Sequence, residues 1–197
     1  MQLTNLKTHL LGKHYEFYKE IDSTQNEIWR RINENNIKNG TVISAGIQTQ
    51  GKGTHGRIWH TDEPNNVAFS MYIETNCNIN CLDGITVEFA DSITNIMREK
   101  YNIYLDVKKP NDLMYNGKKV GGILTESKVN LEKVKFLIIG IGINTNKQNF
   151  TQDIENIATS IKKEFGTEIE EEELITEICN EFEKIIMKKI KLQNDNK

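Results

Sequence analysis

Hydrophobic and polar positions change their period several times along the chain, and each period predicts an element. Alternating apolar residues predict a strand at residues 14–20, and Asn116-Gly117 is the two-residue signature of a hairpin. Apolar runs rich in β-branched residues predict further strands at residues 41–47, 67–73, 104–107, 120–125 and 134–141. We therefore expect most of these strands to be neighbours in one sheet.

Between and after the predicted strands, apolar residues recur at helical spacing and predict helices. A first helix is expected in TQNEIWRRINEN, capped by Asp22 or Ser23, and the last residues, QNDNK, are expected to fray. Further helices are expected at residues 85–101, 157–165 and 170–190, with Gly166 ending the second of these three. The fold class predicted is α/β or α+β, with a mostly antiparallel or mixed sheet.

Length and composition predict that residues 1–197 form one compact domain. The 197 residues are 37% hydrophobic and 27% charged, with a net charge of -3, which is ordinary for a folded protein and gives no basic field for DNA or an anionic membrane. No apolar run approaches the roughly 20 residues of a membrane span, and the start lacks the pattern of a signal peptide. A cytoplasmic protein with neither DNA nor membrane partners is expected.

The cysteines and histidines do not predict a metal site. Cys77 and Cys81 form a lone C-x3-C, Cys179 lies far away, and the histidines do not complete a ligand pattern. In a cytosolic setting we expect reduced, structural cysteines. No metal ligand is assigned to a protein side chain.

The segment QTQGKGTHGRIW, residues 48–59, carries the first candidate chemistry. Three glycines alternate with Lys52 and Arg57, so the backbone can approach an anion while cationic side chains project towards it. It matches neither the Walker A pattern nor the dinucleotide fingerprint. The alternative is a flexible surface hairpin.

Two more clusters follow. In KKPNDLMYNGKKVGGILTE, residues 108–126, the hairpin turn brings Asp112 and Lys119 near each other, and Gly121-Gly122 would let a flat ligand lie against the backbone. The alternative is an ordinary hairpin with exposed charges. In GIGINTN, residues 140–146, the asparagine amides either bind a ribose, base edge or phosphate, or close a turn.

Together with the triplet DST at 22–24, the clusters resemble, in the same order, the motifs of the biotin protein ligases. The matching segments are QTQGKGTHGRIW at 48–59, KKPND at 108–112, KVGGIL at 119–124 and GIGIN at 140–144. The resemblance covers roughly residues 14–165. It implies a catalytic domain with a central mixed, largely antiparallel sheet flanked by helices, related in fold to lipoate ligases and class II aminoacyl-tRNA synthetases.

The resemblance also implies an activity. With ATP and Mg²⁺, biotin would form biotinyl-5'-AMP, and a lysine of a biotin carboxyl carrier domain would then take the biotinyl group. The carrier would belong to acetyl-CoA carboxylase or another biotin-dependent carboxylase or decarboxylase. Two alternatives stay open: a lipoate or octanoate ligase or transferase of the same fold, and a sensor that binds biotin or a nucleotide without transferring it.

Motif positions imply roles for individual residues. Lys119 would stabilise charge at the reacting carboxyl and phosphate oxygens, Arg57 would contact the phosphates, and Asp112 would orient the incoming lysine or accept its proton. The biotin pocket would be lined by Ser23, Thr24, Gln25, Gln48, Lys52, Gly53, Thr54, Lys119, Gly122 and Leu124. The nucleotide would contact Lys52, Arg57, Trp59, Asn111 and Asn144.

Three positions depart from the family pattern. Lys52 and Thr54 stand where arginines are usual, and Lys109 stands where tryptophan is usual. Because the loop has one fewer cation, we predict leakier retention of biotinyl-AMP than in a ligase with both arginines. An N-terminal DNA-binding domain and a C-terminal small β-barrel are not expected, nor is operon repression, whereas a homodimer is compatible with the resemblance.

Overall fold

A seven-stranded sheet forms the centre of the computed structural model, which describes residues 2–61 and 63–194. The strand order is β1-β2-β3-β7-β6-β5-β4. β1 and β2 pair in parallel, and the other five neighbouring pairs are antiparallel, which confirms the mixed, largely antiparallel sheet. The strands are β1 (His14–Ile21), β2 (Thr41–Gln48), β3 (Val67–Asn78), β4 (Asp106–Lys108), β5 (Asp112–Tyr115), β6 (Lys118–Asn130) and β7 (Lys133–Ile143).

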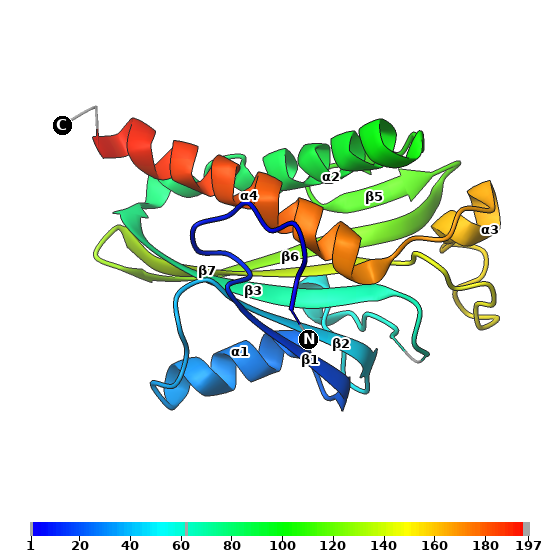
Figure 1. The fold of residues 1–197 in the computed structure, drawn as a ribbon, viewed down its shortest axis with the longest axis horizontal. Coiled ribbons are helices and arrows are strands. Elements are labelled where there is room, and N and C mark those ends of the chain that lie inside the picture. Colours follow the sequence, from blue (N-terminus) through cyan, green and yellow to red (C-terminus); the bar gives the residue numbers. More distant parts are fainter. Residues whose placement is uncertain (1, 62, 195–197) are drawn as a thin grey trace.

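Helices cover both faces of this sheet (Figure 1). α1 (Thr24–Asn33) packs on one face, and α2 (Ile85–Tyr101) and α4 (Glu171–Asn194) pack on the other. The short α3 (Ile161–Phe165) precedes α4, and two 3-10 turns, η1 (Thr54–Gly56) and η2 (Ile79–Leu82), complete the order. No helix within the described ranges is long and apolar enough to cross a membrane.

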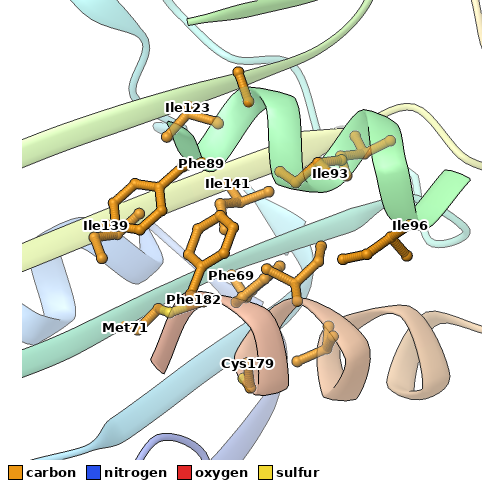
Figure 2. Close-up of a cluster of buried hydrophobic side chains, with 14 of the residues drawn as sticks. Phe69, Met71, Phe89, Ile93, Ile96, Ile123, Ile139, Ile141, Cys179 and Phe182 are labelled. Carbon is orange, nitrogen blue, oxygen red and sulfur yellow. The ribbon is translucent and has the colours of Figure 1, made fainter. Parts of the chain in front are cut away.

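The alternation of side chains along β7 explains the two cores. Leu137, Ile139, Ile141 and Ile143 point towards α2 and α4, where Phe89 and Phe182 stack with ring centroids 4.1 Å apart (Figure 2). On the opposite face, Phe136 and Ile138 pack with Ile28 of α1 in a smaller core. The next two positions on that face are Gly140 and Gly142, so the layer of large side chains stops there.

Several predicted boundaries hold and others are wrong. The strands predicted at 67–73 and 120–125 are longer in the structure, where β3 continues to Asn78 and β6 to Asn130. The Asn116-Gly117 hairpin is confirmed, with both residues at positive φ between β5 and β6. The helix predicted at 157–165 begins only at Ile161, because Ser160 caps it and the preceding residues pair with β6 through a bridge from Ala158 to Lys119. The strand predicted at 104–107 spans Asp106–Lys108. Of the tail expected to fray, residues 195–197 lie outside the described ranges.

The prediction of reduced cysteines is wrong for Cys77 and Cys81, which form a disulfide. η2 turns the chain directly after β3 and brings the two Cα atoms to 6.4 Å, a separation that periodicity alone did not indicate. Cys179 is a free, fully buried thiol, and burial raises its pKa well above the usual range.

Candidate active site

A cavity lies on the α1 face of the sheet, where glycines replace the large side chains. Gly140 and Gly142 of β7 and Gly122 of β6 form its floor beside the first turn of α1. The empty space measures about 430 Å³, part of it open to solvent. The complete lining is Ser23, Thr24, Gln25, Gln48, Lys52, Gly53, Thr54, Trp59, Phe69, Ser70, Asn111, Lys119, Gly122, Ile123, Leu124, Gly140, Ile141 and Gly142.

Neutral polar groups converge at the α1 end of this cavity. The Thr24 backbone N–H donates to Gln48 Oε1 at 2.9 Å, and the Thr24 hydroxyl lies 2.8 Å from the Ser70 hydroxyl. Ser70 donates in turn to Gln25 Oε1 at 2.9 Å, and Gln25 Nε2 donates to Glu126 at 2.7 Å. Ser23 caps α1 and is fully buried. These groups can recognise a neutral polar head of a ligand.

The loop from residue 49 to 61 is an ordered hairpin beside the cavity. Gly53 N–H donates to the Arg57 carbonyl at 2.8 Å, and Trp59 N–H donates to the Gly51 carbonyl at 2.9 Å. At its tip, His55 and Gly56 both adopt positive φ. Lys52 and Arg57 are exposed, so the loop carries two cations near the cavity, in line with the anion-binding interpretation of its sequence.

Lys119 and Asp112 meet across the β5–β6 hairpin, as predicted. Lys119 Nζ donates to Asp112 Oδ1 at 2.6 Å, and both side chains are largely buried. A Cβ at Gly122 would lie 3.1 Å from Lys119 Nζ, so the ammonium rests directly above this glycine on the cavity floor. The pair therefore presents a fixed cation to a ligand.

A second, larger cavity adjoins the first. It encloses about 740 Å³ of empty space, part of it open to solvent, and has a more apolar wall. Phe150 lies in that wall with the ammonium groups of Lys147 and Lys163 at 5.5 and 5.6 Å from its ring centroid. The complete lining is Gly53, Thr54, Arg57, Ile58, Trp59, His60, Lys119, Asn144, Lys147, Phe150, Ile154, Ile157 and Ala158.

Four residues line both cavities: Gly53, Thr54, Trp59 and Lys119. The Lys119 ammonium lies 5.7 Å from the Trp59 ring centroid, and the Trp59 indole N–H is buried without a partner in the described part of the chain. Ligands in the two cavities would meet at this junction. A cation there lowers the repulsion between two anionic groups, most strongly where water is excluded.

All ten residues assigned by resemblance to the biotin pocket line the first cavity. Of the residues assigned to the nucleotide, Arg57, Trp59 and Asn144 line the second cavity. Lys52 and Asn111 line the first cavity instead. Asp112 reaches the junction through its bond to Lys119 and is in neither lining.

Both asparagines of the GIGINTN segment hold the fold in place. Asn144 Nδ2 donates to the Thr159 carbonyl at 3.0 Å, and Asn146 exchanges two hydrogen bonds with the Ile169 backbone. Asn146 therefore fits the turn-closing alternative. Asn144 does so too, but it also faces the second cavity.

The sequence did not identify Ser70, Glu126, Lys147 or Phe150 as site residues. Ser70 has a signal, because it is a polar residue in the apolar run VAFSMYI on the face that a strand turns towards α1. The other three depend on which segments meet. Lys147 is nearly buried and lies 3.9 Å from the Glu63 carboxylate, which periodicity does not reveal.

A bidentate ion pair lies at the entry to α1. Asp22 accepts two hydrogen bonds from the Arg30 guanidinium at 2.8 Å, and this bonding holds the pKa of the Asp22 carboxyl well below its usual range. Gln50 N–H donates to the Asp22 carbonyl at 2.7 Å. Asp22 thus links the start of α1 to the loop rather than facing the cavity.

Comparison with known proteins gives consistent matches. The model of the biotin/lipoate A/B protein ligase family matches residues 17–144. The chain is 36% identical over 181 residues to the bifunctional ligase/repressor BirA of Bacillus subtilis (strain 168), covering 91% of this chain and 55% of BirA. It is 26% identical over 194 residues to the biotin–protein ligase of Homo sapiens, covering 92% of this chain and 26% of that protein.

Among solved structures, the biotin protein ligase from Aquifex aeolicus in complex with biotin and ATP superposes with a TM-score of 0.71. The identity is 29%, and the match covers 92% of this chain and 72% of that one. The chain spans about half the length of the Bacillus relative, as the 55% coverage indicates.

Proposed function

The chain belongs to the biotin/lipoate A/B protein ligase family, and we propose that it is an ATP-dependent ligase that forms biotinyl-5'-AMP and transfers biotin to a lysine of a biotin carboxyl carrier protein. The observation that carries the proposal is the position of Lys119, whose ammonium lines the wall common to two cavities. A reaction that joins a carboxylate to a phosphate needs a cation at such a junction.

Biotin would occupy the first cavity. Its ureido ring is neutral and polar, and the neutral hydroxyl and amide groups of Thr24, Gln25, Gln48 and Ser70 can exchange hydrogen bonds with it. Its carboxylate would then point towards Lys52 and Lys119. An octanoyl chain or a dithiolane ring would leave these polar groups unpaired, so the lipoate alternative fits less well.

ATP would occupy the second cavity, with its adenine against the apolar wall and its phosphates near Arg57 and Lys119. Mg²⁺ would be held by phosphate oxygens and would neutralise part of their charge. Within residues 2–61 and 63–194, no group of three or more His, Cys, Asp or Glu is arranged to hold a metal ion. The biotin carboxylate would attack the α-phosphorus, and pyrophosphate would leave.

In the second step, the carrier lysine must lose a proton before its amine attacks the biotinyl carbonyl; the bond between this carbonyl carbon and the phosphate oxygen then breaks, and AMP leaves. Asp112 is the proposed acceptor. Its Oδ1 accepts from Lys119 at 2.6 Å, and Oδ2 is the oxygen proposed to orient the incoming ammonium. In this role, the Lys119 ammonium that stabilises the adenylate would be hydrogen-bonded to the Asp112 carboxylate that receives the proton of the carrier lysine.

The carrier is the proposed macromolecular partner, and the proposed location is the cytoplasm, where ATP and the carrier would be available. We propose no DNA partner, because the net charge of -3 gives no basic field that would attract DNA. Homodimer formation stays a prediction of the family resemblance.

One experiment tests the proposal. The protein is incubated with ATP, Mg²⁺, biotin and an apo carrier domain, and the carrier is analysed by mass spectrometry while pyrophosphate is measured. We expect a biotin-sized mass increase on one carrier lysine and biotin-dependent pyrophosphate release. Absence of both contradicts the ligase assignment, whereas biotin binding without either product supports a sensor.

A further inference from the structure

The Glu126 carboxylate lies outside the cavity lining and accepts a hydrogen bond from Gln25 at the polar end of the first cavity. We infer that Glu126 is a positioning residue that fixes the orientation of the Gln25 amide, so that this end of the cavity accepts N–H donors from its ligand. The inference rests on the proposed function and deepens it, because it assigns part of the selection for a cyclic urea to a residue that does not line the cavity.

Glu126 sits on β6 opposite Gln25 and Trp29, which lie one turn apart on α1. Its Oε2 accepts from Gln25 Nε2 at 2.7 Å and from Trp29 Nε1 at 2.8 Å. Residues four apart on a helix share one face, so a single carboxylate oxygen serves both donors. An ionised carboxylate is an acceptor only, and therefore it selects the amino end of the Gln25 amide.

The opposite end of the amide is fixed as a consequence. Gln25 Oε1 accepts from the Ser70 hydroxyl at 2.9 Å, and it lies 2.7 Å from the place where a Cβ at Gly140 would be. Gln25 and Ser70 are 3% and 1% exposed, so water competes little for these hydrogen bonds. The amide oxygen thus stays on the cavity floor above Gly140.

The Thr24 hydroxyl lies beside this chain of hydrogen bonds. It donates to Gln48 Oε1 at 3.1 Å and lies 2.8 Å from the Ser70 hydroxyl, whose one hydrogen goes to Gln25. Donation therefore runs from Ser70 through Gln25 to Glu126. The groups that line the cavity, Thr24 Oγ1 and Gln25 Oε1, keep lone pairs for a ligand.

This polarity has a consequence for ligand choice. A cyclic urea brings N–H donors that can satisfy such acceptors, whereas a hydrocarbon or dithiolane end leaves them unpaired in a buried place. Without Glu126, the Gln25 amide can rotate and present its NH₂ group towards the ligand. The NH₂ group of Gln25 would then face an N–H group of the cyclic urea, and neither could accept a hydrogen bond from the other.

The test compares Glu126→Met, which removes the acceptor at similar length, with Glu126→Gln, which retains one carbonyl oxygen. Biotin and ATP dissociation constants are measured by calorimetry. For Glu126→Met we expect biotin binding to weaken about 10- to 30-fold, with ATP binding within about twofold. For Glu126→Gln we expect biotin binding within about threefold, because its oxygen can still accept from Gln25.

Trp29→Phe is the matched control, since it removes the other donor to the same oxygen and leaves Gln25 untouched. We expect its biotin affinity to stay within about twofold of wild type. A Trp29→Phe variant as weak as Glu126→Met would show that the carboxylate acts by joining α1 to β6, and would overturn the inference. Glu126→Thr, which suits a strand and is too short to reach Gln25, replaces Glu126→Met if that variant does not fold.

Two further outcomes are decisive. Tight biotin binding by the variant without the acceptor, or equal weakening by Glu126→Gln, overturns the positioning role while the proposed ligase function stands. Failure of the wild-type protein to bind biotin overturns the proposed function and this inference together.

Discussion

Thr54→Arg tests whether the missing cation of the loop governs retention of the adenylate. Thr54 lines both cavities, and its hydroxyl accepts a hydrogen bond from Arg57 Nη2 at 2.8 Å. Arg57 Nε also donates to the Thr54 carbonyl at 3.2 Å. Thr54 therefore orients Arg57 along the loop. An arginine at position 54 would place a second guanidinium at the junction, while Arg57 would keep its backbone contact.

The magnitude follows from the exposure of the loop. A hydrogen bond to a charged group contributes about 1.5–3 kcal/mol, whereas an exposed ion pair contributes about 0.2–1 kcal/mol. Thr54 is half-buried and Arg57 is exposed, so a value between these ranges applies. A contribution of about 1–1.4 kcal/mol slows release of biotinyl-AMP about 5- to 10-fold.

The assay forms the adenylate from labelled biotin and ATP, removes free ligand, and follows the label that leaves the protein. Thr54→Val is the control, because it removes the hydroxyl without adding charge, and we expect it not to slow release. Equal release from the wild type and Thr54→Arg would refute the reasoning. Equal slowing by Thr54→Val would assign the effect to the lost hydroxyl instead of the added charge.

Three further predictions concern the reaction and the fold. Lys119→Met should lower biotin-dependent exchange of pyrophosphate into ATP about 10²- to 10³-fold, because the cation at the junction is lost; an unchanged exchange rate contradicts its assigned role. The Glu183 carboxylate accepts hydrogen bonds from the backbone N–H groups of His9, Leu10 and Leu11 at 2.6, 2.9 and 2.8 Å. Glu183→Gln should therefore lower the free energy of unfolding, measured in urea, by about 2 kcal/mol. A change below about 0.5 kcal/mol contradicts this prediction. Burial, with Glu172 and Glu170 nearby, raises the pKa of Glu171 from 4.5 to about 7. The stability linked to this shift is present below pH 4.5 and is lost as the pH rises to about 7, by about 1–2 kcal/mol after allowing for solvent screening of a half-buried group. Urea unfolding at pH 5 and pH 8 should show a smaller loss for Glu171→Gln than for the wild type, and identical losses contradict it.

Local signals predicted the parts of the site that depend on neighbours in sequence. The Asn116-Gly117 turn pairs Met114 with Lys119, and a register shift then pairs Asp112 with Gly122. The Asp112 and Lys119 side chains meet within this short hairpin. The start of α1 follows from the Ser23 cap, and the span of α2 follows from helical spacing. These features need only a few residues of context, so the sequence contains enough information for them.

Contacts between distant segments could not be predicted in this way. Ser70 and Glu126 reach Gln25 across 45 and 101 residues, and a polar residue within a strand does not identify its partner. Their contact depends on β3, β7 and β6 lying side by side beneath α1, a strand order that periodicity leaves open. The orientation of the Gln25 amide therefore cannot be predicted without the strand order.

Glycines at the site make room for other groups of the protein. The sequence suggested that Gly51 lets a ligand approach the backbone, yet a Cβ there would lie 2.2 Å from the Trp59 carbonyl. A Cβ at Gly142, to which the sequence assigned no role, would lie 2.3 Å from the Trp59 ring. At Gly140 it would lie 2.7 Å from Gln25 Oε1. Each of these glycines thus makes room for a side chain or backbone group of the protein that forms the cavity. A substitution there would displace Trp59 or Gln25 before any ligand is bound, so weakened binding by such a variant reports on the shape of the cavity rather than on a lost ligand contact.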